Sequence, residues 1–353
     1  MGHPWRSGFC HDQIMFAADD EGRVENGNAD SGVSLTQRPL VVAVDLGGTH
    51  LRGGAVDERG GIHSRFKLAT PRDLNPSALV NAIVNAIDEC RRSVSIAGTE
   101  VSAIAVAVPG NVRDGSVGSA PNIPALNGLR LREILAGELR LPVTLENDAN
   151  AAAVGEMWRG AGRSARTIVC ITLGTGVGGG IILDGKLWRG HDGSAAEVGH
   201  ISVNPFGGVP CGCGSHDCLE VYASATAVVR LARESIPNYP DSQLTLEPEL
   251  TAEKIFRAGV NGDVLARETF RVMGVYLGAG LATLINLINP EVIIIGGGAA
   301  DAWELFAESM NAEVRSRSFP LPAAEVKIVR AECGDDAGLL GAAHLALSQD
   351  RLL

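Results

Sequence analysis

The sequence predicts an α/β protein built from two similar halves. Apolar runs of strand length alternate with segments of helical periodicity, which is the pattern of α/β folds. A strand, a glycine hairpin and a second strand also occur twice, at an offset of 173 − 46 = 127 residues. The aligned pairs are Leu46 with Leu173, Gly47 with Gly174, Gly53 with Gly180 and Asp57 with Asp184. This repetition favours a duplicated fold with a ligand between its halves, although two unrelated hairpins could share the pattern by chance.

Length and composition narrow the class of protein. The chain has 353 residues, which suggests two domains. Its formal net charge of −11 argues against nucleic acid or an anionic membrane as the main partner. Four of the seven cysteines are scattered and suggest no disulfide framework. Residues 1–37 are polar and aperiodic, without the apolar core of a signal peptide, so we expect a disordered tail and a cytoplasmic protein.

One uncharged run, Val272 to Pro290, is long enough to be considered as a membrane span. Glycines and asparagines interrupt it at Gly274, Gly278, Gly280, Asn286 and Asn289. We interpret the run as a buried core or interface helix, and its apolar character suggests a homodimer.

The predicted elements alternate along the chain. In the first half they are strands at Leu40–Val44, Leu51–Val56, Ile62–Leu68, Val101–Val108 and Leu141–Glu146, with a helix at Ser77–Arg92. In the second half they are strands at Thr167–Leu173, Ile181–Leu183, Glu291–Ile295 and Val326–Val329, with helices at Ala266–Ile288, from Asp301 and from Asp336.

Three glycine loops could hold phosphate groups or a nucleotide. Bare N–H groups in the two hairpins can bind phosphate oxygens, and Thr49 and Thr175 would add hydroxyl donors. Gly296–Gly298 lies between a predicted strand and helix, where a nucleotide can approach the backbone closely. Any one of these loops alone could be an ordinary tight turn. The second hairpin formally matches Gly-x-Gly-x-x-Gly, but it opens a strand rather than a helix, which argues against a dinucleotide-binding loop.

A candidate catalytic acid follows the predicted strand Leu141–Glu146. Asn147 and Asp148 begin a segment of helical composition. Asp148 would lie at the carboxyl end of the strand as a base for a substrate hydroxyl, with the helix N-terminus keeping it ionised. Phosphoryl transfer tolerates a weak base, because its loose transition state needs late proton removal. Either residue could instead be a simple helix N-cap.

Zinc-type ligands gather in one short stretch in the middle of the chain. The four candidate ligands are His200, Cys211, Cys213 and Cys218. Their number and type match a structural Cys₃His zinc site. Two carboxylates, Glu197 and Glu220, bracket the stretch, so a bound metal would hold acids and an imidazole on a rigid surface for a polar ligand. Cys211 and Cys213 could alternatively form a redox pair without a metal.

In this order, the motifs resemble the ROK family of sugar kinases and sugar-responsive repressors. The resemblance covers the chain from about residue 40 and rests on Asp45–Thr49, Glu146–Asn150, Leu173–Gly180, Glu197–His200 and Cys211–Glu220. It implies an actin-like (ribonuclease-H-like) two-domain fold whose cleft closes over a sugar and ATP. The expected division is a small domain of residues 38–146 plus 334–353 and a large domain of residues 147–333 with the zinc loop.

The resemblance implies a role for each matched residue. Asp148 resembles the catalytic base that takes the proton from the sugar 6-hydroxyl, and Asp45 resembles the residue that holds Mg²⁺. His200 would bind zinc through one ring nitrogen and face the sugar with the other. The implied sugar ligands are Asn147, Asp148, Glu197, His200 and Glu220, with Gly110 and Asn122 at the rim. The implied nucleotide contacts are Asp45, Gly47, Gly48, Thr49, Thr175 and Gly176, to which the third glycine loop adds Gly297 and Gly298.

Two positions depart from the family pattern. His50 stands where the family often has lysine, which affects only a secondary contact. Asp217 replaces the usual glycine of Cys-Gly-x-x-Gly-Cys, and aspartate accepts a positive φ less readily than glycine does. We therefore expect a slightly altered zinc loop that keeps its ligands.

The sequence thus predicts a kinase that transfers phosphate from ATP to O6 of a hexose, most similar to the glucokinase branch of the family. The open alternatives are kinases of N-acetylmannosamine, N-acetylglucosamine or fructose, and polyphosphate as the donor. A non-catalytic sugar-responsive repressor would need a DNA-binding module, and residues 1–37 are too short and acidic to supply one. The implied cofactors are ATP, Mg²⁺ and a structural Zn²⁺.

Overall fold

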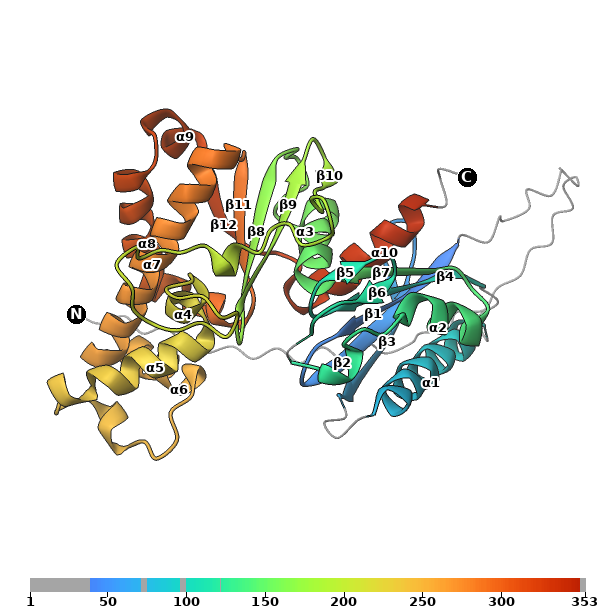
Figure 1. Cartoon of the computed structure of the whole chain (residues 1–353), viewed down its shortest axis with the longest axis horizontal. Helices are drawn as coiled ribbons and strands as arrows, with labels where there is room; N and C mark the ends of the chain where they lie inside the picture. Colours follow the sequence, from blue (N-terminus) through green and yellow to red (C-terminus); the bar gives the residue numbers. More distant parts are fainter. Residues whose placement is uncertain (1–38, 71–74, 96–99, 121, 350–353) are drawn as a thin grey trace, which may run out of the picture. The chain divides into compact units, whose positions relative to one another are not determined.

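The computed structural model describes residues 39–70, 75–95, 100–120 and 122–349. The tail expected for residues 1–37 lies outside this part. Two five-stranded sheets organise the described residues (Figure 1).

The first sheet has the strand order β3-β2-β1-β4-β7. β1, β2 and β3 form an antiparallel meander, and β1, β4 and β7 run parallel. The strands are β1 (Leu40–Leu46), β2 (His50–Val56), β3 (Ile62–Ala69), β4 (Val101–Val108) and β7 (Val143–Asn147). A small ribbon of β5 (Val112–Arg113) and β6 (Ser116–Val117) follows β4.

The second sheet repeats this plan with the order β10-β9-β8-β11-β12. β8 pairs antiparallel with β9 and parallel with β11, as β1 does with β2 and β4. Its strands are β8 (Ile168–Leu173), β9 (Val177–Leu183), β10 (Lys186–Leu187), β11 (Val292–Gly296) and β12 (Lys327–Arg330). The shared order confirms the predicted duplication.

The alignment of the two hairpins needs one correction. In the first hairpin Gly53 pairs with Val44, and the equivalent residue of the second hairpin is Gly179. The predicted alignment of Gly53 with Gly180 is therefore wrong by one residue. The second turn is one residue shorter than the first, which a gapless comparison of the sequence does not detect.

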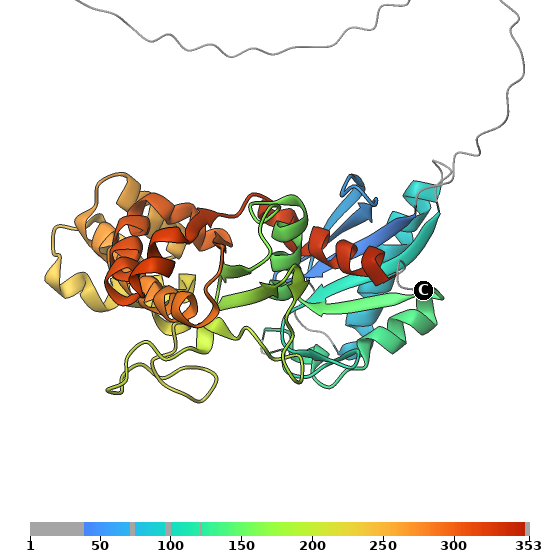
Figure 2. The ribbon, with the colours of Figure 1, turned by 90° about the horizontal axis from the view of Figure 1, so that it is seen from above.

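Helices cover both faces of the first sheet (Figure 1 and Figure 2). α1 (Pro76–Ser95) and α2 (Leu131–Leu139) pack on one face, and α10 (Ala337–Gln349) packs on the other. The spacing of Leu79, Ile83 and Ile87, which predicted a helix, puts all three side chains in the core.

The second sheet has α3 (Asp148–Arg159) on one face and a helical layer on the other. This layer contains α5 (Ala225–Ser235), α6 (Ala252–Val260), α7 (Val264–Ile288) and α8 (Trp303–Arg317). The short helices α4 (Glu220–Ala223) and α9 (Pro320–Glu325) complete the described α-helices. The sequence analysis predicted α7 and a helix in the region of α8 but none of α4, α5 and α6.

α7 is the one described helix whose length and composition would suit a membrane span, and half of its most apolar window is buried within the chain. The packing of α7 on α8 explains the glycines in its apolar sequence. A Cβ atom at Gly274 would lie 2.5 Å from Phe306 O, and one at Gly278 would lie 2.4 Å from Met310 O. Both glycines therefore allow α7 to pack closely on α8, as expected for a core helix.

α3 makes similarly close contacts with its neighbours. A Cβ atom at Gly341 of α10 would lie 1.7 Å from Ala151 O, and one at Gly155 would lie 2.1 Å from Ala337 O. On its other side, Gly180 of β9 leaves room for Ala153. Small residues therefore let α3 lie tightly between the second sheet and α10.

We predict that Gly341→Ala lowers the free energy of unfolding by about 2–3 kcal/mol, because the added methyl group would overlap the backbone of α3. The matched control is Gly137→Ala in α2, where the added Cβ meets no atom within 4 Å. That substitution should instead stabilise the helix by about 0.5–1 kcal/mol. Urea denaturation of both variants measures the difference, and equal effects would contradict the packing argument.

Candidate functional site

Four candidate metal ligands converge after β10. The ligand atoms of His200, Cys211, Cys213 and Cys218 all lie within 4.8 Å of one another. The Sγ atoms of Cys213 and Cys218 are 3.7 Å apart, and Cys211 Sγ lies 3.7 Å from His200 Nδ1. In tetrahedral zinc coordination, with Zn–S of about 2.3 Å and Zn–N of about 2.0 Å, ligand atoms are separated by about 3.5–3.8 Å. The four side chains fit zinc in both type and spacing.

The crowding of the thiols in this cluster opposes ionisation of Cys218 unless a cation is bound. Burial, together with the two neighbouring thiols, raises the pKa of Cys218 to about 12. A divalent cation would favour deprotonation and turn crowded thiols into thiolate ligands. The ring of His200 presents Nδ1 to Cys211, while Nε2 lies 3.9 Å from Glu197 Oε2. One ring nitrogen thus belongs to the cluster, and the other faces a predicted sugar ligand.

Asp217 occupies the glycine-like position of the cysteine loop with φ of 54°. This left-handed conformation is the one that glycine was expected to supply. Its buried carboxylate provides compensating contacts, because Oδ1 accepts hydrogen bonds from Val209 N at 3.0 Å and from the Tyr222 hydroxyl. The substitution therefore ties the loop to α4 while leaving the four ligand atoms close together.

Glu220, the first residue of α4, connects the cysteine loop to the second glycine hairpin. Its Oε2 accepts a hydrogen bond from Val177 N at 3.0 Å. A Cβ atom at Gly176 would lie 2.2 Å from the same oxygen, so only glycine leaves room for the carboxylate. A predicted sugar ligand and a predicted phosphate-binding residue are therefore direct neighbours.

The second hairpin loop consists of residues 174–176 only. Gly174 N donates to Gly176 O at 2.9 Å, and Thr226 Oγ1 donates to Thr175 O at 2.8 Å. The next glycines lie in β9 and serve packing: a Cβ atom at Gly179 would lie 2.4 Å from Val198. The long glycine run thus combines a short loop with a strand that neighbouring elements approach closely.

The third glycine loop lies beside this hairpin. Gly297 has φ of 84°, and a Cβ atom there would lie 2.5 Å from Leu173 O at the end of β8. A Cβ atom at Gly298 would meet nothing within 4 Å. Gly297 therefore allows the start of the next helical segment to pack against the second hairpin. The backbone at Gly298 stays accessible.

The first hairpin is closed by Gly47, whose N–H donates to His50 O at 2.9 Å. Thr70 Oγ1 donates to Gly47 O at 2.6 Å, which secures the turn to the end of β3. Gly48 and Thr49 are exposed, and the Cβ position of Gly48 is 3.6 Å from Asn122 Cβ. The predicted sugar rim residue Asn122 thus neighbours the predicted phosphate loop.

Asn147 joins β7 to α3 and acts as the N-cap of that helix. Its Oδ1 accepts a hydrogen bond from Asn150 N at 2.9 Å. Its Nδ2 donates to Gly110 O at 3.0 Å and to Asp148 Oδ1 at 3.1 Å. The N-cap interpretation is therefore correct for Asn147, and this cap also holds the carboxylate of Asp148 beside Gly110.

Asp148 and Asp45 are two partly buried carboxyl groups that influence each other. Burial, reinforced by the charge of Asp45, raises the pKa of Asp148 to about 7. Burial raises the pKa of Asp45 to about 6, although the positive charge of Arg52 opposes the shift. The expectation that the helix N-terminus keeps Asp148 fully ionised is wrong, because desolvation outweighs its hydrogen bond from Ala149 N. A carboxyl group with a pKa near 7 is better matched to base catalysis at neutral pH than an ordinary aspartate.

The sequence analysis missed an ion pair between a buried glutamate and a partly exposed arginine next to these residues. Glu146 is almost completely buried, and its Oε2 lies 2.7 Å from both Nε and Nη2 of Arg189. Its Oε1 accepts hydrogen bonds from Asn147 N and Asn150 Nδ2. Arg189 follows β10 and begins the segment that leads to Glu197 and His200. An arginine eight residues before Glu197 gave no signal in the sequence, because its partner is remote in the chain.

The structure thus gathers the predicted residues into two groups. The first contains Asp45, Gly47, Gly48, Gly110, Asn122, Asn147 and Asp148. The second contains Thr175, Gly176, Glu197, His200, Glu220, Gly297 and the three cysteines. The pair of Glu146 and Arg189 connects the strand of the first group to the segment of the second.

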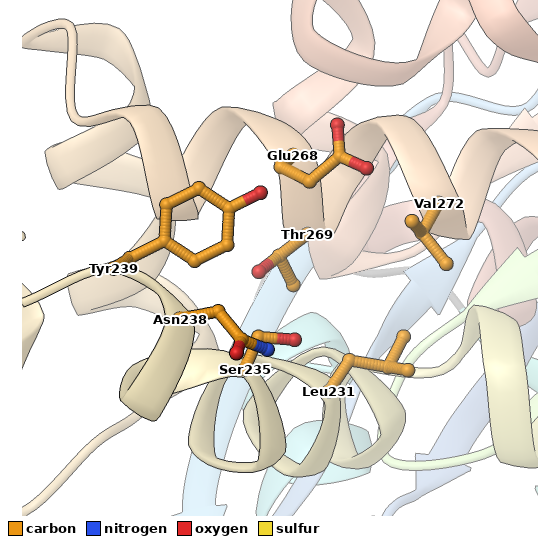
Figure 3. Close-up of a pocket in the computed structure, with 7 residues that line it drawn as sticks. All are labelled: Leu231, Ser235, Asn238, Tyr239, Glu268, Thr269 and Val272. Atoms are coloured by element: carbon orange, nitrogen blue, oxygen red, sulfur yellow. The ribbon is translucent and has the colours of Figure 1, made fainter.

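A surface cavity of ≈ 410 Å³ lies elsewhere, between α5 and α7 (Figure 3). Tyr239, Glu268 and Thr269 contribute to its lining, and none of the predicted site residues does. Its carboxylate is already paired, since Glu268 binds Arg271 through two contacts of 2.7 Å. We therefore place the candidate site at the glycine hairpins and not at this cavity.

The fold and the site together define an actin-like two-domain protein. The ROK family profile matches residues 41–349, and the chain belongs to this family.

Relatives of two kinds match most of the chain. The glucokinase of Streptomyces coelicolor is 39% identical over 326 residues, which cover 89% of this chain and 99% of the relative. A ROK family glucokinase from Streptomyces griseus, solved in complex with glucose and AMPPNP, is 40% identical with a TM-score of 0.75 and covers 88% of this chain and 99% of its own. A ROK family transcriptional regulator, a homologue of the E. coli MLC protein, is 29% identical with a TM-score of 0.80 and covers 88% of this chain and 78% of its own.

We predict that the purified protein contains one zinc ion per chain and that Cys213→Ala loses it, because three ligands bind zinc less tightly than four. The exposed side chain of Cys213 makes the substitution tolerable for the core. The matched control is Cys90→Ala, which removes a buried thiol far along the chain from the cluster. Elemental analysis after dialysis provides the measurement. Full zinc content in Cys213→Ala, or none in the wild type, would refute the assignment.

Proposed function

We propose that this protein phosphorylates a hexose at its 6-hydroxyl with ATP, converting glucose to glucose 6-phosphate. The observation that carries the proposal is the position of Asp148. Its carboxyl group lies at the start of α3 beside Asn147 and Gly110, within electrostatic reach of Asp45. Membership of the ROK family and the similarity to glucokinases from two Streptomyces species support this reaction.

Asp148 would act as the general base. Its Oδ1 is occupied by Ala149 N and Asn147 Nδ2, and no described hydrogen bond engages Oδ2, so that oxygen suits the role of proton acceptor. The proton of the sugar 6-hydroxyl would pass to the carboxylate as O6 forms its bond to the γ-phosphorus of ATP. The bond from that phosphorus to the bridging oxygen breaks, and ADP leaves. A pKa near 7 allows a sizeable ionised fraction at neutral pH and a useful affinity for the proton.

The two hairpins would hold the nucleotide phosphates. Because Gly47 N and Gly174 N already bond within their turns, the assigned donors are the backbone N–H groups of Gly48, Thr49 and Gly176. Thr175 would add its hydroxyl, and Gly297 and Gly298 would border the nucleoside. A Mg²⁺ ion bound with ATP would neutralise charge on the phosphates, and Asp45 would hold it through water.

The sugar hydroxyls would be bound by groups from both sheets. Asn147 and Asp148 lie where β7 of the first sheet leads into α3, and Gly110 and Asn122 would lie at the rim of the sugar site. Glu197, His200 and Glu220 come from the segment that follows β10 of the second sheet and flanks the cysteine loop. Zinc would orient the imidazole so that its free nitrogen meets the sugar, which is a structural rather than a catalytic role.

The proposal also specifies which hexose is phosphorylated and which molecule donates the phosphate. N-acetylmannosamine, N-acetylglucosamine and fructose also carry a hydroxyl group at C6, and polyphosphate carries phosphoryl oxygens like those of ATP. A coupled assay with a panel of hexoses, amino sugars and both donors decides between them. We expect the highest kcat/KM with glucose and ATP.

A sugar-responsive repressor is the second candidate, because a ROK transcriptional regulator shares the fold. The acidic chain and the complete set of kinase residues favour catalysis. Sequence-specific DNA binding that survives moderate salt, together with absent kinase activity, would favour the repressor.

The remaining expectations concern organisation and location. We propose a small domain of residues 38–146 plus 334–353, a large domain of residues 147–333, a cytoplasmic location and a homodimer. α7 mostly packs within its own chain, which removes the original reason for a dimer. A different reason for a dimer is a group of exposed large apolar residues near the end of α7 and the start of α9. They are Leu287, Phe319 and Leu321.

We predict that Asp148→Asn lowers kcat by about 10²–10⁴-fold, because the amide keeps the shape of the carboxyl group but accepts no proton. The KM for glucose should change by less than about threefold, since the hydrogen-bonding geometry is retained. Asp184→Asn, an exposed aspartate in the β9–β10 turn, is the control and should retain full activity. A kcat of Asp148→Asn within tenfold of the wild type would contradict the base assignment.

The raised pKa of Asp148 also predicts a pH-dependent stability of the free protein. The folded carboxyl has a pKa of about 7 against about 3.9 when unfolded, so the folded state holds an extra proton between these values. Stability therefore falls as pH rises from about 4 to 7. Asp148→Asn removes this loss and should be more stable than the wild type at pH 8, on the order of 1–3 kcal/mol, with a smaller difference at pH 5. Denaturant titrations without ligands test this, and an equal difference at both pH values would contradict it.

A further inference from the structure

Glu156, near the end of α3, is a buried acid that the proposed reaction does not use. Only 1% of the residue is exposed. Its Oε1 accepts a hydrogen bond from Cys333 N at 2.7 Å, and its Oε2 accepts from Ala161 N at 2.9 Å and from Glu332 N at 3.1 Å. Three backbone donors on one carboxylate compensate for the cost of its burial.

Two of these donors, the N–H groups of Glu332 and Cys333, lie where the chain passes between the two sheets. It first crosses at Asn147–Asp148, where β7 of the first sheet leads into α3 on the second. It returns through residues 331–336, which join β12 of the second sheet to α10 on the first. Glu156 lies on the helix of the first crossing and binds the backbone of the second.

The surrounding residues are adapted to this contact. A Cβ atom at Gly160 would lie 2.0 Å from Glu156 Oε2 and 2.9 Å from Cys333 Sγ. A Cβ atom at Gly155 would lie 2.1 Å from Ala337 O at the start of α10. Two glycines thus leave the space in which the carboxylate and the returning backbone meet.

We propose that Glu156 is a positioning residue that locks the two crossings into one pivot, so that the two sheets and their helices close as rigid bodies on hexose and ATP. The inference rests on the proposed function for its ligands. Without the lock, residues 331–333 gain freedom in the open state, and fewer molecules have the arrangement that binds both substrates. The apparent affinity for each ligand equals its intrinsic affinity multiplied by the fraction of molecules that can bind. The affinities for hexose and for ATP therefore fall by the same factor.

The test compares Glu156→Gln with the wild type. The amide has the same shape but presents N–H groups where the backbone needs an acceptor. We expect the KM for glucose and the KM for ATP to rise together by about tenfold, the factor expected for losing one hydrogen bond to a charged group. We expect kcat at saturation to stay within about twofold, because saturating ligands restore the competent arrangement. Unchanged KM values, a change in only one of them, or a fall in kcat alone would overturn the proposal.

Glu291→Gln is the matched control. Glu291 Oε1 also accepts two backbone hydrogen bonds, from Arg166 N at 2.8 Å and Thr167 N at 2.9 Å, but these residues directly precede β8 and β11 of the second sheet and lie in neither crossing. This variant loses the same kind of contact without touching a crossing and should keep both KM values. If Glu156→Gln does not fold, Gly160→Ala displaces the carboxylate with its added methyl group and must give the same paired rise.

Amide hydrogen exchange separates this inference from the proposed function. The peptide that contains Glu332 and Cys333 should exchange faster in Glu156→Gln, measured on the free protein without any substrate. Faster exchange in a protein that phosphorylates no hexose would mean that only the proposed function fails. Unchanged exchange would overturn the lock, whatever the protein phosphorylates.

Discussion

The close packing of α3 between the second sheet and α10 is the contact on which the rest of the structure depends. Glycines on both neighbours make it possible: Gly180 on β9, and Gly341 on α10 opposite Ala151. Packing at this density leaves no room for an additional methyl group, so α3 is held in close contact with β9 and with α10. The residues at its two ends, Asp148 and Glu156, are therefore held at defined places between the halves of the protein.

This position determines what each buried acid can do. Glu146 is neutralised by Arg189, and Glu156 is satisfied by three backbone amides, so both serve the architecture. Asp148 accepts hydrogen bonds from Ala149 N and Asn147 Nδ2 on one oxygen and lies within the electrostatic influence of Asp45, and burial raises its pKa to about 7. Three acids on one short stretch of chain therefore differ in role according to the groups that they contact: Glu146 and Glu156 are structural, and Asp148 is available for chemistry.

The cysteine loop gives the second half of the site a comparable rigidity. Its ligand spacing suits zinc, and His200 directs its other nitrogen toward Glu197. Glu220 extends from the same loop to the backbone of the second hairpin, and Asp217 ties the loop to α4. The predicted sugar and phosphate contacts on this side are thus linked by a few short bonds, as accurate alignment of two substrates requires.

The sequence by itself determined the duplicated α/β plan, the Cys₃His set and the three glycine loops, because periodicity, ligand type and glycine clusters are local signals. It also marked Asp148, although it could not supply that residue's pKa, which depends on burial and on Asp45. The one-residue shift between the hairpins, the pairing of Glu146 with Arg189 and the contact of Glu156 with the 332–333 backbone were decided only by the tertiary structure. Each of these joins segments that are distant in the chain, and no local pattern records which distant group a side chain will meet.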